Sequence, residues 1–363
     1  MKKKIKLFDP IINGRESLAL EKTFKSKFWA SGAGGKQVVE FEKKFLKKFN
    51  SDYNIAVNSG TAALYLSLSM ENIQNKEVIL PSMSFVSTAH AVIANNAKPV
   101  FADINLDTLC IDPEEIEKSI TSSTKIILPV HFAGMPSDLK RIQEICYSNN
   151  LTLIEDAAHA VGATFDGKKI GGHGKFVCFS FHPVKNLAMP TGGLISINDK
   201  NYRKIAEKLK AKRWCGITDR IETSYDVKDF GWNYYMNELS AAIGIIQLEK
   251  LERLNKIRQN NAKRYFDELN CIRKLKFDKS CVYHFYWILV KNRDKLRKIL
   301  FNEGIETGTH YKPIHKLTMY NKKTSLPNTE YAGKSIITLP THPNLTENNL
   351  DKIIKIINKH EKS

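Results

Sequence analysis

The sequence has no apolar run that is long enough to cross a membrane. Its longest apolar runs, such as residues 286–290, are far shorter than the roughly 18 residues that a spanning helix needs. The basic residues 2–4 are followed by residues 5–10, which do not form the apolar core of a signal peptide. We therefore predict a cytoplasmic protein that has no membrane partner.

Cysteine is scarce and its spacing is uninformative. The six cysteines form neither a C-x-x-C pair nor any short spacing typical of metal ligands. This argues against a disulfide scaffold and against a cysteine metal site. We interpret the cysteines as reduced thiols that pack as small apolar side chains.

Acidic residues are outnumbered by basic ones, which gives a formal net charge of +18. Such a surface attracts anions. The basic residues are spread along the whole chain, without an arginine-rich arm, zinc-finger spacing or an aromatic RNA-binding motif. We therefore expect no nucleic-acid partner. An anionic small substrate and a generally lysine-rich composition both remain compatible with the charge.

The chain is apolar enough for a large core, and its 363 residues suggest about two domains. Between residues 55 and 200, short apolar runs alternate with segments of helical periodicity, which predicts an α/β fold with a mostly parallel central sheet covered by helices. The expected strands are residues 78–80, 99–103, 126–130, 153–156 and 177–181, and the expected helices are residues 61–70, 86–95 and 137–148.

A long helical stretch follows at about residues 237–269 and is predicted to link two domains. Apolar runs at 286–290 and 336–339 and a closing helix at 350–357 indicate a smaller C-terminal α+β domain. We place the large domain at residues 1–240. The linking helix and the small domain occupy residues 241–363.

Three short motifs carry candidate chemistry. In the first, a predicted strand ends in Ser59-Gly60-Thr61-Ala62 and a helix begins at once. Free N–H groups at such a helix start, together with the Thr61 hydroxyl, form an anion site that the helix dipole strengthens. A plain helix cap is the alternative interpretation of this motif taken alone.

The second motif places Asp156 at the end of a predicted strand, with His159 three residues later. Open parallel sheets bind their ligands at the carboxyl ends of the strands. A carboxylate there can pair with a buried cationic heterocycle, and His159 can face the same ligand. A capping aspartate and a core histidine are the alternative.

The third motif follows another strand and contains Ser180, His182 and Lys185. The Ser180 hydroxyl can bind a phosphate group. A partly desolvated Lys185 amine is a nucleophile. Any single lysine in so basic a chain is otherwise a surface charge.

Together these residues match the needs of pyridoxal 5′-phosphate. This cofactor requires a phosphate cup, a carboxylate at its ring nitrogen, a lysine that binds its aldehyde and a group that stacks on its ring. Phe85, after the strand at 78–80, is a candidate for the stacking role, although it could equally belong to the core.

The sequence resembles the DegT/DnrJ/EryC1/StrS family, the sugar aminotransferases of pyridoxal-phosphate fold type I. The resemblance covers nearly the whole chain and keeps the order of the family's motifs. The matching segments are WASG at 29–32, EFE at 40–42, SGTAAL at 59–64, PSMSF at 81–85, PVHFAG at 129–134, EDAAH at 155–159, SFHPVK at 180–185, GWNY at 231–234 and HYKPIH at 310–315.

The resemblance implies a role for each matching position. The catalytic pair is Lys185, which binds the cofactor covalently, and Asp156, which pairs with the ring nitrogen. The phosphate is held by residues of the first and third motifs, and Asn233 reaches the neighbouring subunit's phosphate, so that the functional unit is a homodimer. The full cofactor-binding set is Ser59, Gly60, Thr61, Ala62, Phe85, Asp156, His159, Ser180, Lys185 and Asn233, and His182, His310 and Tyr311 are predicted to bind substrate.

The resemblance also implies the reaction. The family's dehydratases carry histidine in place of the lysine, so Lys185 favours transamination. The expected donor is L-glutamate, and the expected acceptor is a keto group at C3 or C4 of a nucleotide-linked deoxysugar, used for surface polysaccharide or glycan biosynthesis. The alternatives are a small phosphorylated ketone as acceptor, a pyridoxal-phosphate sugar dehydratase, and a non-catalytic regulatory or nucleic-acid-binding relative.

Overall fold

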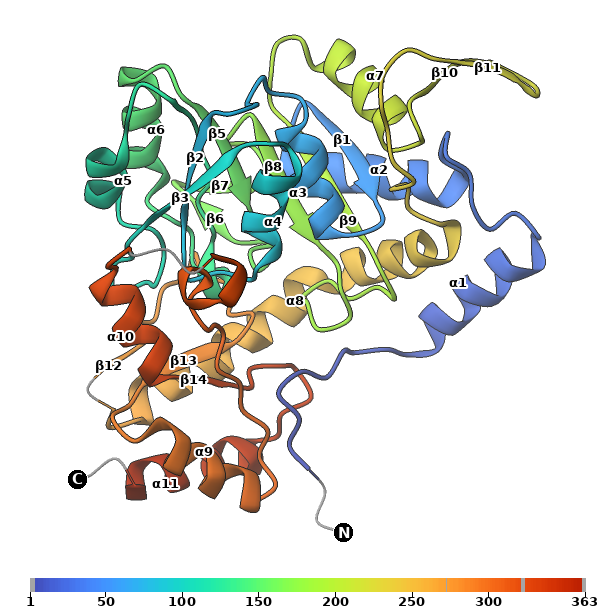
Figure 1. Cartoon of the computed structure of the whole chain (residues 1–363). Helices are drawn as coiled ribbons and strands as arrows, with labels where there is room; N and C mark the ends of the chain where they lie inside the picture. The colour runs from blue at the N-terminus through green and yellow to red at the C-terminus, as the bar shows by residue number, and fades with distance from the viewer. Residues whose placement is uncertain (1–3, 272, 321–323, 361–363) are drawn as a thin grey trace.

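The computed structural model describes residues 4–271, 273–320 and 324–360. A seven-stranded sheet runs through the larger part of the molecule in the order β1-β9-β8-β5-β4-β2-β3 (Figure 1). Within it, β9 is antiparallel to both neighbours and the other pairings are parallel. The strands are β1 (Tyr53–Val57), β2 (Glu77–Pro81), β3 (Lys98–Ala102), β4 (Thr124–Ile127), β5 (Thr152–Asp156), β8 (Phe176–Ser180) and β9 (Gly193–Ile197). The mostly parallel α/β sheet predicted from the sequence is confirmed.

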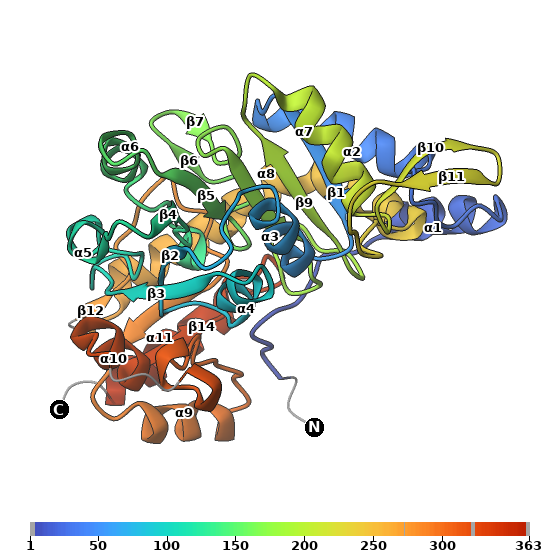
Figure 2. The same ribbon diagram turned by 45° about the horizontal axis from the view of Figure 1, so that its top comes forward.

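Helices cover both faces of this sheet (Figure 2). One apolar cluster joins a face of the sheet to α2 (Lys36–Phe49), α5 (Pro113–Ser119), α6 (Leu139–Ser148) and the long α8 (Glu238–Glu268). A second cluster joins the opposite face to α3 (Gly60–Leu68), α4 (Ser87–Ala94) and α7 (Tyr202–Lys212). Because both faces are covered, most of the strand residues are buried whichever way their side chains point.

Helix α2 shows how the spacing of apolar residues builds this core. Phe41, Phe45 and Phe49 recur every four residues, so their rings lie on one face of the helix and are at most 1% exposed. Phe45 and Phe49 stack at 4.0 Å between ring centroids. Phe179 of β8 meets the Phe45 ring at 5.1 Å. This packing fixes β8, the strand that leads directly to Ser180.

The C-terminal part has a small sheet and a third apolar cluster of its own. The predicted α+β elements are present here, and α8 enters this part from the large sheet (Figure 1). The elements are β12 (Arg273–Lys274), β13 (Tyr286–Leu289), α9 (Arg293–Asn302), α10 (Pro327–Ser335), β14 (Ile336–Leu339) and α11 (Glu347–His360), with short 3₁₀ turns η2 (Ile314–Lys316) and η3 (Thr318–Tyr320).

The start of the chain packs against this C-terminal part. Ile5 donates its N–H to the carbonyl of Gly304 at 2.8 Å and accepts from Glu306 at 2.9 Å. The predicted domain boundary at residue 240 remains a prediction. The contact shows that Ile5 lies beside the C-terminal elements.

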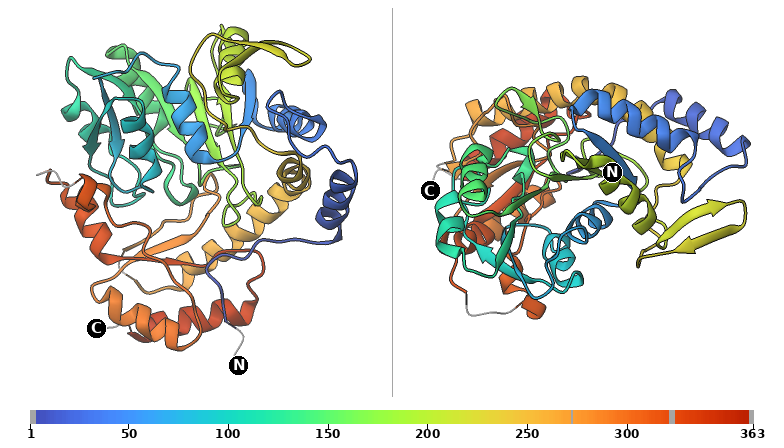
Figure 3. Two further views of the ribbon diagram at one scale, coloured as in Figure 1. Left: turned by 45° about the vertical axis from the view of Figure 1, so that its right-hand side comes forward. Right: turned by 90° about the horizontal axis from the view of Figure 1, so that it is seen from above.

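Two elements project from one side of the molecule. These are α1 (Gly14–Lys25) and the hairpin of β10 (Ile217–Ile221) and β11 (Ser224–Val227), which extend in the same general direction in two views (Figures 1 and 3). The smaller β6 (Thr164–Phe165) and β7 (Lys168–Lys169) pair with each other, and η1 (Phe132–Gly134) follows β4. Cys110, Cys146, Cys178 and Cys281 are buried free thiols, and Cys215 is an exposed one.

No helix among the described residues combines the length and the apolar composition that crossing a membrane requires. Likewise, the described part of the chain holds no group of three or more His, Cys, Asp or Glu side chains arranged to bind a metal ion.

Candidate active site

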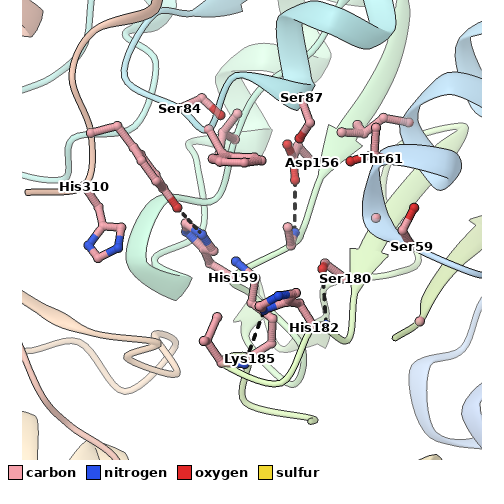
Figure 4. Close-up of a pocket in the computed structure, with 18 of the residues that line it drawn as sticks. Ser59, Thr61, Ser84, Ser87, Asp156, His159, Ser180, His182, Lys185 and His310 are labelled. Atoms are coloured by element: carbon pink, nitrogen blue, oxygen red, sulfur yellow. Dashed lines mark hydrogen bonds between the residues drawn. The ribbon is translucent and has the colours of Figure 1, made fainter. Parts of the chain in front are cut away.

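A cavity of about 310 Å³ lies where several strands of the large sheet end (Figure 4). The turns after β1, β2, β5 and β8 all contribute side chains to it. Because the carboxyl ends of parallel strands meet at one edge, residues far apart in sequence converge there. The predicted residues that line this cavity are Ser59, Gly60, Thr61, Phe85, Asp156, His159, Ser180, His182, Lys185, His310 and Tyr311.

The turn after β1 caps helix α3 and brings the start of that helix close to the end of β8. Ser59 is the N-cap of α3, and its hydroxyl accepts the N–H of Ala62 at 3.1 Å. A Cβ atom on Gly60 would lie only 2.7 Å from the Cβ of Ser180, and one on Gly193 would lie 2.3 Å from the carbonyl oxygen of Ser59. Glycine is therefore needed here so that the start of α3 can approach the end of β8.

Asp156 ends β5 and is 4% exposed. Its Oδ2 accepts the hydroxyl of Thr88 at 2.8 Å, and its Oδ1 accepts the N–H of Ala158 at 3.1 Å. Burial raises the pKa of the Asp156 carboxyl, while these two hydrogen bonds and the Lys185 amine oppose the rise. The carboxylate is thus held in one orientation and is poised to pair with a cation.

A buried pair fixes the backbone next to Asp156. The Nδ1 of His131 accepts a hydrogen bond from the N–H of Ser137 at 3.0 Å. The proton of the ring is therefore on Nε2, which donates a hydrogen bond to Glu155 at 2.8 Å. Both side chains are fully buried. The backbone N–H of His131 donates to the carbonyl of Asp156 at 3.1 Å. The pair therefore anchors the strand end from the side opposite the cavity.

Lys185 lies half-buried in the loop that follows β8. Its backbone N–H donates to the carbonyl of His182 at 2.8 Å, which closes the turn that carries the side chain into the cavity. Burial lowers the pKa of the Lys185 amine to about 8, and the charge of Asp156 opposes the shift. About a tenth of the amine is therefore neutral and nucleophilic at pH 7, far more than for an ordinary lysine.

His159 is buried beside Tyr311, and its Nε2 lies 3.1 Å from the Tyr311 hydroxyl. Its Nδ1 has no hydrogen-bond partner among the described residues. The ring of His284 packs 4.6 Å away between centroids. Burial, with the positive charge of Lys185, lowers the pKa of His159 well below its usual range, so the imidazole is neutral.

The remaining predicted residues surround the mouth of the cavity. Phe85 is 56% exposed, and its ring lies 6.0 Å from that of Tyr311. The exposed face leaves room for a flat ring to stack on it. His310 has its Nδ1 2.8 Å from the Thr338 hydroxyl, and burial lowers its pKa to about 4. His182 is exposed on the other side.

Two predicted residues do not line this cavity. Ala62 is buried, and its N–H is used by Ser59. Asn233 is exposed, and its backbone carbonyl accepts the side-chain amide of Asn58 at 3.3 Å. Asn233 therefore does not line the cavity of its own subunit.

The sequence analysis missed other residues of the site. Thr88, which holds Asp156, follows Phe85 by three residues and so lies one helical turn away on α4. Its hydroxyl in the first turn of a helix that follows Phe85 is the signal that could have revealed it. Ser84, Ser87 and Val184 also line the cavity without having been predicted.

Comparison with known proteins identifies the chain. The model of the DegT/DnrJ/EryC1/StrS aminotransferase family matches residues 10–358. The chain belongs to this family. It is therefore an aminotransferase, and its cofactor is pyridoxal 5′-phosphate.

Individual relatives match this aminotransferase over nearly its whole length. Uncharacterized protein MJ1066 of Methanocaldococcus jannaschii is 35% identical, with 98% of this chain and 96% of that protein covered. PseC of Helicobacter pylori, an aminotransferase involved in the biosynthesis of pseudoaminic acid, is 28% identical, with a TM-score of 0.92 over 99% of this chain and 100% of the other. The pyridoxal-phosphate form of the putative sugar aminotransferase Spr1654 of Streptococcus pneumoniae is 26% identical, with a TM-score of 0.92 over 98% of both chains.

The residues present suit this cofactor. The close approach of Gly60 to Ser180 brings the start of α3 and the Ser180 side chain together at the cavity, with no room for a Cβ between them. The unpartnered Nδ1 of His159 and the fixed carboxylate of Asp156 offer polar contacts to a heterocycle. The Lys185 amine, with its lowered pKa, can attack an aldehyde. No feature of the cavity conflicts with pyridoxal phosphate.

The lowered pKa of Lys185 predicts how its reactivity depends on pH. In the cofactor-free protein, trace acetylation with acetic anhydride should reach half its maximal rate at Lys185 near pH 8, because only the neutral amine reacts. Nα-acetyllysine added to the same sample should titrate near its ordinary value of about 10.4. Peptide mass spectrometry measures both rates, and coincident profiles would contradict the assigned environment.

The glycine at the start of α3 predicts a second result. Gly60→Ala should weaken the binding of pyridoxal phosphate by about tenfold or more, because the added Cβ pushes Ser180 out of place. Gly14→Ala is the matched control, since a Cβ there meets nothing within 4 Å. Titration of the cofactor into each cofactor-free protein, followed by visible absorbance, gives the affinities. Equal affinity of Gly60→Ala and wild type for the cofactor would show that the close approach of α3 to Ser180 does not shape the cofactor site.

Proposed function

We propose that this aminotransferase moves an amino group from L-glutamate to the keto group, at C3 or C4, of a nucleotide-linked keto-deoxysugar. The observation that carries the proposal is the Lys185 amine, with a pKa of about 8, in one cavity with the fixed carboxylate of Asp156. The name of PseC, which links it to the biosynthesis of pseudoaminic acid, supports a sugar acceptor. The thiols of Cys110, Cys146, Cys178, Cys215 and Cys281 suit a reducing cytoplasm, where such a step would serve surface-glycan biosynthesis.

The mechanism assigns separate tasks to Asp156 and Lys185. Pyridoxal phosphate, when bound, carries the amino group between the two half-reactions and delocalises the electron pair left on the donor's α-carbon. Asp156, oriented by Thr88 and Ala158, would pair its carboxylate with the ring nitrogen of the bound cofactor and would keep that nitrogen protonated. The Lys185 Nζ removes the proton from the donor's α-carbon and returns a proton to complete each half-reaction.

Other residues would bind and orient the cofactor and the substrates. The start of α3 and the Ser180 hydroxyl would bind the phosphate. Both line the same cavity and offer N–H and hydroxyl donors there. Phe85 would stack on the ring with its exposed face. His159, held neutral by burial, would act as a hydrogen-bonding partner and not as a charge. His182 and His310 would contact the substrates from the mouth of the cavity.

The same residues give less support to the alternative acceptors and reactions. Dehydratase chemistry is disfavoured because the position that carries histidine in the family's dehydratases is Lys185 here. A non-catalytic role is disfavoured because both Lys185 and Asp156 are present and lie in one cavity. A small phosphorylated ketone remains the alternative acceptor, since the net charge of +18 attracts either anion.

The functional unit that we propose is a homodimer in which Asn233 serves the partner's site. Asn233 lies outside its own cavity and is exposed. Large apolar side chains around it are exposed as well, with Phe230 at 64% and Trp232 at 43%. The adjoining hairpin exposes Ile221 at 75% and Tyr225 at 57%. A surface of this kind is typical of an interface between subunits.

A direct test removes the catalytic amine. Wild type should show a visible cofactor band that disappears with L-glutamate and should then aminate a keto-sugar nucleotide. Lys185→Ala should lose all turnover, because no other group supplies the nucleophile and the base, yet it should still bind pyridoxamine phosphate. Near-normal turnover in this variant would rule out the mechanism. A band that glutamate leaves unchanged would exclude the proposed donor.

Mixing two inactive variants tests the role of Asn233. Lys185→Ala and Asn233→Ala subunits, unfolded and refolded together in equal amounts, should recover about a quarter of wild-type activity. Half of the dimers then contain one subunit of each variant. If Asn233 crosses the interface, each of these mixed dimers has one site in which both native residues are present; otherwise it has none. Each variant refolded alone is the control. Activity no higher than that of Asn233→Ala alone would place Asn233 in its own site.

A further inference from the structure

Three buried side chains form a row of hydrogen bonds that ends at the carboxylate of the active site. The Asp156 Oδ2 accepts the Thr88 hydroxyl at 2.8 Å, and the Thr88 Oγ1 lies 2.8 Å from the Ser84 Oγ. Thr88 has no exposed surface, and Ser84 is 3% exposed and lines the cavity (Figure 4). We call this row the Ser84–Thr88–Asp156 chain.

The Thr88 hydroxyl has two acceptors within reach but only one proton. That proton can go to the Asp156 carboxylate or to the carbonyl oxygen of Phe85, which lies 3.0 Å away. The Phe85 carbonyl also accepts the backbone N–H of Thr88 at 3.1 Å. A carbonyl only accepts, whereas a carboxyl group donates when it is protonated. The direction of the Thr88 hydroxyl therefore depends on whether Asp156 is charged.

When Asp156 is ionised, the two hydroxyl protons of the chain point toward it. Thr88 donates to the carboxylate, because a charge-assisted hydrogen bond is stronger than one to a neutral carbonyl. The lone pairs of the Thr88 oxygen are then free for Ser84, which donates its own proton to Thr88. Each bond polarises the next, so Ser84 strengthens the bond between Thr88 and Asp156. The chain thus stabilises the charged form of the carboxyl group over the neutral form.

Burial acts on Asp156 in the opposite direction. Desolvation raises the pKa of this carboxyl, and the hydrogen bonds from Ala158 and Thr88, together with the charge of Lys185, oppose the rise. The Lys185 amine is neutral when it acts as a nucleophile, so its charge does not support the carboxylate throughout the reaction. The hydrogen bonds from Thr88 and Ala158 are available whichever way Lys185 is charged.

A second buried aspartate shows how a structural carboxylate is bonded in the same chain. Asp103 is 4% exposed and accepts the Thr329 hydroxyl at 2.7 Å. It also accepts three backbone N–H groups, those of Ile104, Asn328 and Thr329. Within the described residues, Asp156 accepts only one backbone N–H, and its Oδ2 is bonded by Thr88 alone. The Asp156 carboxylate therefore depends far more on its threonine than Asp103 does.

We propose that Ser84 and Thr88 are positioning residues that keep the Asp156 carboxylate ionised and directed at the ring nitrogen of pyridoxal phosphate. The chain thereby determines how much the ring nitrogen contributes to the binding of the cofactor. This inference rests on the pairing of Asp156 with the ring nitrogen in the proposed function.

Titration of the cofactor-free protein with two cofactors, followed by visible absorbance, tests the inference. One is pyridoxal phosphate, and the other is 1-deazapyridoxal phosphate, in which a C–H group replaces the ring nitrogen. The ratio of the two dissociation constants isolates the contact with the nitrogen, because all other contacts are shared. Wild type should prefer pyridoxal phosphate, and Thr88→Val should reduce this preference by about tenfold, as expected for one hydrogen bond to a charged group. Its affinity for the deaza analogue should change little.

Three further variants separate positioning from a merely structural role. Thr88→Ser keeps the hydroxyl and should restore most of the preference. Ser84→Ala should reduce the preference by a smaller factor, and it decides the test if Thr88→Val does not fold. Thr329→Val is the matched control, since it removes a hydroxyl from an equally buried threonine on the Asp103 carboxylate outside the cavity, and it should keep the wild-type ratio.

The outcomes that overturn the inference differ from the one that overturns the mechanism. An unchanged ratio in Thr88→Val, or in Ser84→Ala where only that variant folds, would overturn the inference while the pairing of Asp156 stands. Equal losses of affinity for both cofactors would also overturn it, because they would show a structural role. A wild type that binds both cofactors equally would instead remove the pairing of Asp156 from the proposed mechanism.

Discussion

The buried carboxylate of Asp156 is the constraint on which the rest of the site depends. A carboxylate with 4% exposure is costly unless it is hydrogen-bonded and paired with a cation. Thr88 and Ala158 supply the hydrogen bonds. The cationic partner is left to the Lys185 amine and to the ring nitrogen of the cofactor. The site is therefore built around a charge that the folded protein alone does not fully compensate.

Several layers of the fold maintain that arrangement. The His131–Glu155 pair holds the end of β5 from behind, and the phenylalanines of α2 hold β8. Since Asp156 ends one strand and Ser180 ends its parallel neighbour, the register of the sheet places both beside the start of α3. A shift of one residue in either strand would turn the functional side chain to the opposite face. The rigid sheet thus determines the geometry of the chemistry.

Neutral groups surround the reactive amine. Burial lowers the pKa of Lys185, His159 and His310 together, so the cavity does not gather several cations around the phosphate and the substrate. The neutral amine can act as nucleophile and as base, and the neutral imidazoles can only donate or accept hydrogen bonds.

The sequence by itself predicted part of the fold and many residues of the cavity: β2, β3, β4, β5 and β8 were expected, whereas α1, α2, β9 and the β10–β11 hairpin were not. Apolar periodicity predicted the strands and helices, because period 2 and period 3.6 are set by local backbone geometry. Motifs at strand ends predicted Asp156, Ser180 and Lys185, since the carboxyl ends of parallel strands converge. Only the tertiary structure revealed Thr88 on Asp156 and His284 against His159. These contacts join residues separated by tens to hundreds of positions, and no local pattern encodes which distant side chains the packing of the core brings together.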